Sequence, residues 1–408
     1  MTEIQIEKLG AKGDGVAILD GIEVFAPYTV PGERVEGEIQ DGRMAKPRIL
    51  KPVPLRVKAP CSHFKSCGGC LTQHIDPAFL ADWKQELVRD ALSKQGLSTE
   101  LRAIISSPPN SRRRAVFTGK RTKSGAFLGF HARGTSQVIP INQCTLLQPK
   151  ITAGFDGLIK LVQLAASRKS EVRIAVTTSL GGLDISVDDA LPLGNDIQSQ
   201  VVKITHDHGF SRMFWNSEVI LERSAAQQKF GTALITPPNT AFLQATNEGE
   251  AALVKTVQEI VANAKNVADL FSGCGTLTLP IAQTAEVAAF ESDSPMLAAL
   301  DKGWRETTGL KKVSTATRDL FRNPLRLDEL KPFDAVVIDP PRAGARAQVE
   351  ILAQSAVKTI AFVSCNPATF ARDARTLVDG GYTLDWVQTI DQFLWSSHCE
   401  LVAQFSHK

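Results

Sequence analysis

The chain has 408 residues, of which 43% are hydrophobic and 22% are charged, and its formal net charge at pH 7 is +3. This composition is typical of a globular protein and excludes a disordered or collagen-like chain. No apolar run reaches the ~20 residues that a membrane-spanning helix needs, and the first residues lack the basic and apolar regions of a signal peptide. We therefore expect a cytoplasmic protein without membrane association, built from about two or three domains.

Residues 1–55 consist of short apolar runs that are separated by turn signals. The runs Val16–Leu19, Ile22–Phe25 and Arg34–Ile39 have the length and composition of short strands. Glycine-containing pairs such as Asp20-Gly21 break the chain between them. Short strands joined by tight turns predict a small β-barrel of the OB-like or TRAM-like type, an architecture that often binds nucleic acid.

Three cysteines follow in one short loop, with the spacing C-x5-C-x2-C: Cys61, Cys67 and Cys70. Such close spacing lets three thiolates converge on one centre, and Cys144 is the nearest remaining candidate for a fourth ligand. Sets of four thiolates bind zinc or an iron–sulfur cluster, and the spacing does not choose between them. The alternative is a group of unligated buried cysteines. The odd total of seven cysteines argues against a disulfide framework.

A helix is predicted after the cysteine loop. Asp76 is suited to the N-cap and Pro77 to the first helical position. Apolar residues recur on one face from there to Gly96. The following stretch, from Leu101 to about Gln228, mixes strand-like and helical segments.

Two long windows of the chain contain basic residues and no acidic residue. Residues 42–75 hold seven Lys and Arg residues, and residues 101–150 hold nine, including Arg112, Arg113 and Arg114. Acidic residues would repel phosphate, so their exclusion favours a polyanionic partner over a merely solvated basic face. We expect Arg112, Arg113 and Arg114 to contact the phosphates of that partner.

From about Asn247 the chain alternates between helical and strand-like segments. The helical stretch Glu248–Ala262 precedes an apolar strand that ends at Asp269–Phe271. Further strands are expected at Val287–Phe290, Lys312–Thr315, Asp334–Ile338, Thr359–Val363, Thr383–Thr389 and Glu400–Phe405. This alternation predicts an α/β fold with a mostly parallel, doubly wound, Rossmann-like sheet.

The first of these strands runs into a loop, Asp269–Thr276, that contains Gly273 and Gly275. Glycines at this place let the backbone approach a ligand at the carboxyl edge of the sheet, although a structural turn is the alternative. Glu291 ends the next strand, where a carboxylate can accept hydrogen bonds from ribose hydroxyls. S-adenosylmethionine and nicotinamide cofactors both carry such a ribose. The third glycine of the dinucleotide fingerprint is missing, which favours the methyl donor over a nicotinamide oxidoreductase.

Three more reactive side chains are expected at the same edge. Asp339 ends a strand before two prolines that fix a rigid loop, a place suited to gripping a planar amide-like group or to a plain turn. Cys365 follows the next strand, and this position favours a nucleophile over a structural cysteine. Glu400 starts the last predicted strand, from where it can reach the same crevice.

Taken together, these motifs resemble the S-adenosylmethionine-dependent RNA uracil-5 methyltransferases. The resemblance includes the cysteine spacing, the glycine loop and the Phe242-Leu243-Gln244 motif. It continues in three blocks of the C-terminal half: Asp339-Pro340-Pro341-Arg342-Ala343-Gly344, Ser364-Cys365-Asn366-Pro367 with the downstream Ala371-Arg372-Asp373, and His398-Cys399-Glu400. It spans nearly the whole chain, and the Ser-Cys-Asn-Pro block is its most specific part.

The resemblance implies a set of functional residues. It implies a [4Fe–4S] cluster on Cys61, Cys67, Cys70 and Cys144. It implies contacts to S-adenosylmethionine from Gln244, Phe271, Thr276, Glu291, Asp319 and Asp339. It also implies that Cys365 is the nucleophile and Glu400 the base. The chain departs from the family pattern at Ser272, where Cys is frequent, and at Thr276, where Asn is common.

We therefore expect three domains. These are a small β-barrel RNA-binding domain over residues 1–55, a central α+β domain over 56–240 that binds the iron–sulfur cluster and RNA, and a methyltransferase domain over 241–408. The expected reaction methylates C5 of a uridine in RNA through an adduct between Cys365 and C6, with ribosomal RNA favoured over transfer RNA, and the protein is expected to be a monomer. The alternatives are an RNA cytosine-5 methyltransferase and a catalytically inactive RNA-binding cluster protein.

Overall fold

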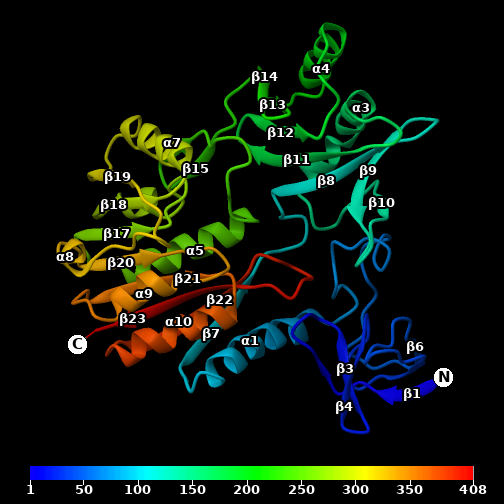
Figure 1. The fold of residues 1–408 in the computed structure, drawn as a ribbon, viewed down its shortest axis with the longest axis horizontal. Coiled ribbons are helices and arrows are strands. Elements are labelled where there is room, and N and C mark those ends of the chain that lie inside the picture. The colour runs from blue at the N-terminus through cyan, green and yellow to red at the C-terminus, as the bar shows by residue number, and fades with distance from the viewer. Residues whose placement is uncertain (408) are drawn as a thin grey trace.

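The computed structural model describes residues 1–407, and Figure 1 shows three lobes. The N-terminal residues form a small lobe at the lower right, the middle of the chain forms a second lobe above it, and the C-terminal residues form the large lobe on the left. No helix in the described part of the chain combines the length and the apolar composition needed to cross a membrane.

The N-terminal lobe is built from two small antiparallel sheets that share one core. One sheet has the order β1 (Thr2–Gln5), β5 (Arg34–Gly37), β6 (Arg48–Lys51), and the other has the order β2 (Lys8–Leu9), β3 (Gly15–Leu19), β4 (Ile22–Ala26). Their alternating apolar residues meet in a cluster that includes Ile4, Val24 and Val35. The β-rich character expected for residues 1–55 is present, while closure into a single barrel stays a prediction.

Helix α1 (Pro77–Ser93) leads from the cysteine loop toward the C-terminal lobe. Its predicted start is confirmed, because the Asp76 carboxylate accepts hydrogen bonds from the backbone N–H groups of Ala78 and Phe79, both at 3.0 Å. Such a cap satisfies amide groups that have no partner inside the helix. The helix ends at Ser93, shortly before Gly96, which has a φ of +64°.

The middle of the chain forms a seven-stranded sheet with helices packed on it. Its order is β10 (Val138–Pro140), β9 (Ala126–His131), β8 (Arg114–Arg121), β11 (Glu171–Ser179), β12 (Gly182–Asp188), β13 (Arg212–Trp215), β14 (Glu218–Glu222). The accompanying helices are α2 (Pro149–Ala153), α3 (Phe155–Ala165) and α4 (Asn195–Asp207). The short hairpin β15 (Gln228–Phe230) and β16 (Ala233–Ile235) then leads to the C-terminal lobe.

The C-terminal lobe contains an eight-stranded sheet. Its order is β19 (Val313–Thr317), β18 (Glu286–Glu291), β17 (Asn266–Leu270), β20 (Ala335–Ile338), β21 (Thr359–Ser364), β23 (Glu400–Ser406), β22 (Thr383–Asp391), β7 (Glu100–Ser106). The strands from β19 to β21 are parallel, whereas β23 is antiparallel to both of its neighbours. The helices of this lobe are α5 (Asn247–Ile260), α6 (Thr278–Ile281), α7 (Ser294–Arg305), α8 (Leu327–Leu330), α9 (Arg346–Leu352) and α10 (Pro367–Asp379).

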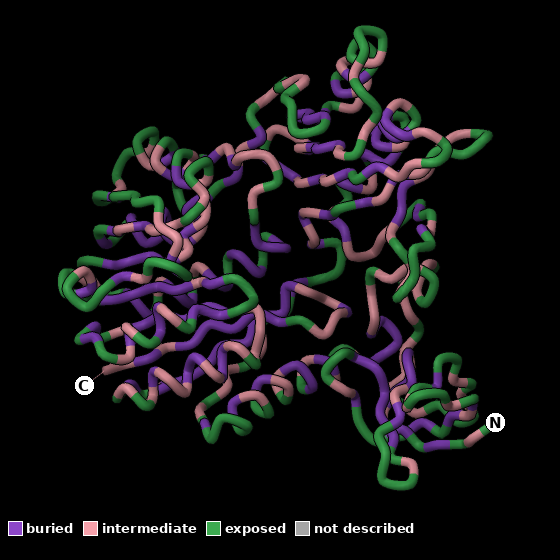
Figure 2. The backbone as a smooth tube through the Cα atoms, in the orientation of Figure 1, coloured by how far each residue is buried: buried purple, intermediate pink, exposed green. Residues whose placement is uncertain are grey.

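The residues of this sheet alternate between two cores, one on each face. Val336 and Ile338 pack into the core with α9 and α10, while Ala335 and Val337 pack into the core with α5 and α7. Figure 2 shows the resulting buried layer through the sheet. Burial on both faces is the property of a doubly wound sheet. This confirms the predicted α/β architecture, and each predicted strand and helix of this half lies within two residues of its observed bounds.

The sheet also includes a strand from far upstream in the chain. β7 pairs in parallel with β22, and α1 packs against α10, with Val88 and Leu92 of α1 in the same core as Phe370. The C-terminal sheet therefore extends across the boundary predicted at residue 241. The seven-stranded sheet is inserted between β7 and α5 in the chain order.

Candidate active site

The carboxyl edge of the C-terminal sheet brings together the predicted nucleophile and base. Ser364, the last residue of β21, pairs with Leu401 of β23 in antiparallel register, and Cys365 and Glu400 are the chain neighbours of this pair. Residues opposite each other in an antiparallel pair have Cα atoms only about 4.5–5.5 Å apart. Asp339 follows β20, the strand on the other side of β21.

The electrostatics of these groups confirm that they share one environment. Burial raises the pKa of Glu400 to about 8, and the Asp339 carboxylate adds to the shift. Burial raises the pKa of Asp339 to about 7. Burial also raises the pKa of Cys365 to about 11; the charges of Glu400 and Asp339 push it in the same direction, and the Arg342 guanidinium opposes them. A carboxyl whose pKa lies near neutral is well suited to accept and return a proton.

Cys365 opens into a cleft of about 1010 Å³ between the C-terminal lobe, α1 and the N-terminal lobe. Six cationic side chains line this cleft, against three acidic ones: Lys8, Lys12, Arg43, Lys94, Arg133 and Arg342 against Asp14, Glu23 and Asp90. The excess of positive charge makes the cleft attractive to a polyanion. Two residues of the cleft wall are bonded to each other, because Arg133 donates to both Asp14 carboxylate oxygens at 2.7 and 3.0 Å.

The glycine loop lies at the same edge, after β17. Phe271, Gly273 and Gly275 all have positive φ values, of 64°, 55° and 93°. Position 275 has no room for a side chain, because a Cβ there would lie 2.8 Å from Leu300. The Gly273 N–H donates to the Glu291 carboxylate at 3.1 Å, which ties the loop to the end of β18.

Two buried oxygen atoms of this loop have no hydrogen-bond partner within residues 1–407: Asp269 Oδ1 and Ser272 Oγ. The other carboxylate oxygen of Asp269 accepts from the Thr278 hydroxyl at 2.5 Å, and burial raises the pKa of Asp269 to about 7. Buried polar atoms rarely stay unpaired in folded proteins. The loop thus fits a polar ligand such as S-adenosylmethionine, whose amino, carboxylate and ribose groups can supply partners.

Asp319 lies in the segment that follows β19, beside an aromatic pair. Its carboxylate accepts from the backbone N–H of Phe321 at 3.0 Å. The Phe321 ring is 48% exposed, and its centroid lies 5.4 Å from that of Phe271. An exposed aromatic face beside Phe271 of the glycine loop is suited to stack on an adenine ring. Phe321 is a candidate that the sequence analysis did not identify.

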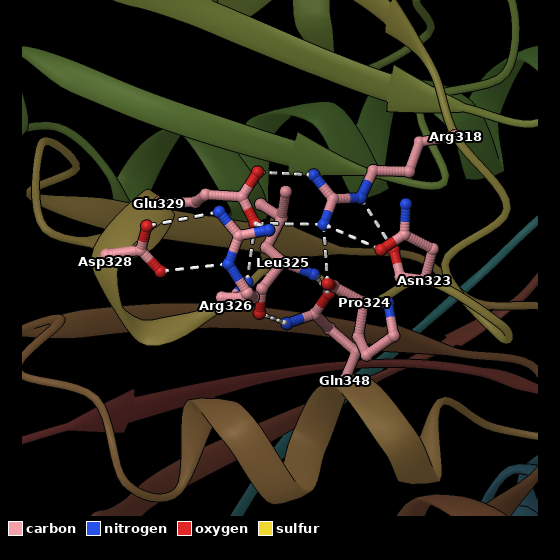
Figure 3. A network of polar contacts seen from close by, with 8 residues as sticks. All are labelled: Arg318, Asn323, Pro324, Leu325, Arg326, Asp328, Glu329 and Gln348. Atoms are coloured by element: carbon pink, nitrogen blue, oxygen red, sulfur yellow. Dashed lines mark hydrogen bonds and ion pairs between the residues drawn. The ribbon is translucent and has the colours of Figure 1, made fainter.

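A network around Arg318 holds this segment in place (Figure 3). The Arg318 guanidinium donates to both carboxylate oxygens of Glu329 at 2.6 and 2.9 Å and to the backbone oxygens of Asn323 and Pro324. Its backbone N–H donates to the Glu291 carbonyl at 2.8 Å. The segment that carries Asp319 is therefore fixed against the end of β18.

Gln244 and Thr276 occupy different surroundings. The Gln244 side chain is buried and accepts a hydrogen bond from the Gln392 amide at 2.6 Å. Gln392 in turn lowers the pKa of Glu400 and so opposes part of the effect of burial. Thr276 lines a cavity of about 850 Å³ between the central and C-terminal lobes, together with Arg113 and Glu250. The structure therefore places Gln244 beside the Glu400 region and Thr276 at the far end of the glycine loop.

The four predicted cysteine ligands line one common cavity of about 530 Å³. The cavity is closed by apolar side chains such as Phe64, Phe130 and Ile141. The four thiols are free and half-buried, and burial raises the pKa of three of them, reaching about 12 at Cys70. No three or more His, Cys, Asp or Glu side chains of the described chain converge closely enough to hold a single metal ion.

The expectation that Arg113 contacts phosphate is wrong. Its side chain is 3% exposed, and its guanidinium pairs with Glu250 and donates to Asn247 at 2.9 Å. Arg114 donates to the Leu243 carbonyl at 2.8 Å, and Arg112 to the Arg114 carbonyl at 3.1 Å. Arg113 therefore joins the central lobe to α5 of the C-terminal lobe, whereas Arg112 bonds within its own segment.

Comparisons with known proteins agree with this geometry. Residues 234–407 match the family described as tRNA (Uracil-5-)-methyltransferase. A protein of Mesorhizobium japonicum named as an RNA methyltransferase is 41% identical, over 98% of this chain and 96% of its own. The 23S rRNA (uracil(1939)-C(5))-methyltransferase RlmD of Nitrosospira multiformis is 32% identical, over 98% of both chains. The crystal structure of Pyrococcus abyssi tRNA (uracil-54, C5)-methyltransferase with S-adenosyl-L-homocysteine has a similar fold, with a TM-score of 0.77, 22% identity and 99% coverage of both chains.

Proposed function

The chain belongs to the family of S-adenosylmethionine-dependent RNA uracil-5 methyltransferases, and from this premise we propose that Cys365 and Glu400 methylate a uridine through a covalent adduct. The observation that supports this proposal is the pairing of Ser364 with Leu401 between β21 and β23, since Cys365 and Glu400 are the chain neighbours of that pair. Family membership also disfavours the cytosine-5 alternative, since the relatives with a stated target base act on uracil.

Cys365 performs the first step. C5 of uracil is a poor nucleophile, and addition of the Cys365 thiolate to C6 moves the electron pair of the C5–C6 bond toward the O4 carbonyl. The resulting enolate is nucleophilic at C5. S-adenosylmethionine, when bound, supplies an electrophilic methyl group. Arg342 assists by favouring the thiolate, since its positive charge lowers the pKa of Cys365.

Glu400 performs the last step. After methylation, C5 carries both the methyl group and its original proton. The Glu400 carboxylate takes this proton, the C5–C6 double bond reforms, and the C6–S bond breaks to return the Cys365 thiolate. A pKa near 8 makes the carboxylate a stronger base than an exposed glutamate.

The residues proposed to hold S-adenosylmethionine are Gln244, Phe271, Thr276, Glu291, Asp319 and Asp339. Four of them, Phe271, Glu291, Asp319 and Asp339, lie at or just after the carboxyl ends of β17, β18, β19 and β20. In this proposal Glu291 accepts hydrogen bonds from the ribose hydroxyls. Phe271 and Phe321 form the aromatic surface that packs against the adenine. The two unpaired oxygens of Asp269 and Ser272 support a polar ligand at this loop.

We propose that Cys61, Cys67, Cys70 and Cys144 hold a [4Fe–4S] cluster. Four cysteine thiolates are the ordinary ligand set of such clusters. All four cysteines line one cavity, which supports a common ligand group for them. The Gly69 N–H lies 3.4 Å from the Cys67 sulfur and can donate to it.

We propose that RNA binds in the cationic cleft at Cys365 and that ribosomal RNA is the substrate. The 32% identity to an enzyme named for 23S rRNA supports this choice. The target base must leave its stack to reach Cys365, so a single-stranded or loop region is expected. In this proposal residues 1–55 bind RNA, residues 56–240 hold the cluster and further RNA, and residues 241–408 carry out the transfer.

The test is methyl transfer from isotopically labelled S-adenosylmethionine to purified ribosomal RNA and transfer RNA, followed by nuclease digestion and mass spectrometry. Labelled 5-methyluridine from ribosomal RNA is expected, and Cys365→Ala serves as the blank. Labelled 5-methylcytidine would contradict the uracil assignment. Transfer to transfer RNA alone would contradict the choice of ribosomal RNA.

A further inference from the structure

Residues 392–399 join β22 to β23 and are called the base loop. They lead directly into Glu400, the first residue of β23. The base loop forms part of the wall of two cavities, because His398 lines both the Cys365 cleft and the four-cysteine cavity. Glu400 lies where the base loop enters β23, opposite Ile390 of β22, so its position depends on the sheet and on how this loop is held.

Lys84 of α1 holds the beginning of the base loop. Its side chain is 1% exposed, and its Nζ lies 2.6 Å from Asp391 Oδ1 and donates to the Phe393 carbonyl at 3.1 Å. The Asp391 carboxylate also accepts from the Phe393 N–H at 3.0 Å. One buried ammonium group thus fixes both the last residue of β22 and the first turn of the loop.

The cysteine loop holds the middle of the base loop. The Trp395 carbonyl accepts hydrogen bonds from the backbone N–H groups of Leu71 at 2.8 Å and Thr72 at 3.3 Å. The Trp395 ring is buried and packs with Leu80 and Trp83 of α1. Helix α1 therefore anchors the loop through a charge at one point and through apolar contact at a second.

A buried ion pair is poor evidence for stability by itself. Removing two charges from water is costly, and an apolar pair of similar volume often stabilises a core equally well or better. The pair instead provides a geometric constraint, because an ion pair and a hydrogen bond limit the position of the loop more tightly than apolar packing does. Catalysis needs that constraint, since a displacement of about 1 Å can lower a rate by about 10²-fold.

We propose that Lys84 is a positioning residue for Glu400, acting through Asp391 and the base loop. This inference rests on the proposed function, in which Glu400 removes the C5 proton after methylation. Lys84 does not reach the reacting atoms. Its loss therefore slows the release of the methylated adduct and leaves the formation of the adduct unchanged.

The experiment follows both steps in a single turnover of the full-length protein with a ribosomal RNA fragment and labelled S-adenosylmethionine. Adduct is measured as RNA-linked protein on denaturing gels, and release is measured as free methylated RNA. Lys84→Met is expected to form adduct at the unsubstituted rate and to release it about tenfold or more slowly, because a misplaced base loses part of its effect. Arg89→Met, which removes an exposed charge from the same helix, is the control.

A second variant guards against misfolding of the first. Lys84→Met leaves Asp391 buried without its cation, whereas Lys84→Met combined with Asp391→Asn removes both charges. The Asn side chain can still accept from the Phe393 N–H. The double variant is expected to keep the thermal midpoint of the control and still to accumulate adduct.

Normal release by the double variant would overturn the proposal. Equal slowing of adduct formation and release, together with weaker binding of S-adenosylmethionine, would also overturn it, since that pattern reports a structural role. The proposed function is tested separately in the same assay by Glu400→Gln. If neither that variant nor the unsubstituted protein forms adduct, the function is wrong; if Glu400→Gln traps adduct and the Lys84 variants do not, only the positioning role is wrong.

Discussion

The active-site edge and the four-cysteine cavity organise reactive groups in opposite ways. At the edge, Cys365 follows β21 and Glu400 begins β23, and backbone hydrogen bonds fix the register of these two strands. At the cavity, Cys61, Cys67 and Cys70 lie in a loop without strands or helices, and Cys144 comes from a separate loop. The geometry of the edge is fixed by strand pairing, whereas the proposed cluster would crosslink loops that have no such pairing. The comparison therefore predicts that substitutions at the edge affect chemistry and that substitutions of the cysteines affect stability.

The largest effect on the chemical side is expected from Cys365→Ala. Without the thiol, C5 is not activated, so both methyl transfer and the covalent complex should be undetectable. The thermal midpoint should stay within a few degrees of the unsubstituted protein, since the thiol is half-buried and forms no ion pair. Residual methylation at more than trace level would show that the reaction does not need the adduct.

Glu400→Gln should stop the reaction one step later. Thiolate attack and methylation proceed, but the C5 proton stays, so methylated, RNA-linked protein accumulates and survives denaturing electrophoresis. Water can replace the base slowly, and general-base catalysis typically contributes about 10²–10⁴-fold. Turnover at the unsubstituted rate by a folded, cofactor-binding variant would remove Glu400 from the mechanism.

Cys67→Ser tests the structural side of the comparison. Loss of one ligand should release the occupant and weaken the loop, because binding of a metal group is coupled to folding. Anaerobically purified unsubstituted protein should contain iron and sulfide in near-equal amounts, and the variant should lack both. Its thermal midpoint should fall by about 4 °C or more. Stoichiometric zinc without sulfide in the unsubstituted protein would contradict the cluster assignment.

The pH dependence of stability should distinguish Glu400 from ordinary glutamates. Its pKa is about 8 in the folded protein, above the usual value of 4.5, so the folded state binds more protons than the unfolded state between these pH values. Stability must therefore decrease as the pH rises through that window. Glu400→Gln does not titrate, so its thermal midpoint should exceed that of the unsubstituted protein at pH 8, with the gap closing toward pH 4.5. A gap that does not change with pH would mean that Glu400 is not shifted.

The smallest effect is expected in the cationic cleft. Lys12 and Lys94 are exposed there and have no ion-pair partner in the described chain. Each cation that contacts a phosphate of single-stranded RNA contributes about 0.7 to the slope of log affinity against log salt. Changing both to Gln should therefore lower the slope by about 1.4, while Lys203→Gln on α4 should not change it. An unchanged slope would place the RNA elsewhere.

Sequence periodicity predicted the C-terminal sheet well because each of its strands is buried on both faces and reads as a short apolar run. The same reading placed Cys365, Asp339 and Glu291 at one edge, since parallel strands end on the same side. It missed β7, because pairing between Glu100–Ser106 and β22 joins residues nearly 300 positions apart in the chain. Local patterns carry no information about such a partner.

Two charged residues show the same limit in the site. Arg113 belongs to a basic run, yet its partner Glu250 lies 137 residues away and neutralises it in the core. Lys84 follows Trp83 on an amphipathic helix, where a lysine normally points to solvent. Only the packing of α1 against the base loop reveals that it is buried. The number of charged residues in a segment predicts its net electrostatic potential. It does not predict which of these residues are exposed and unpaired.

The position of β23 has a consequence for the order of assembly. This strand follows β22 in the chain but lies between β21 and β22, so these two strands have no direct hydrogen bonds to each other. β22 and β23 are consecutive strands that pair with each other, whereas α10 and β22 separate β21 from β23 in the chain, so the pairing of β23 with β21 is the less local of the two contacts. Until that pairing forms, one edge of β21 is unpaired. Glu400 is the first residue of the strand that pairs with this edge. In the proposed mechanism, a chain in which β23 has not yet paired with β21 therefore holds Cys365 without Glu400, and the complete catalytic pair exists only once the sheet is whole.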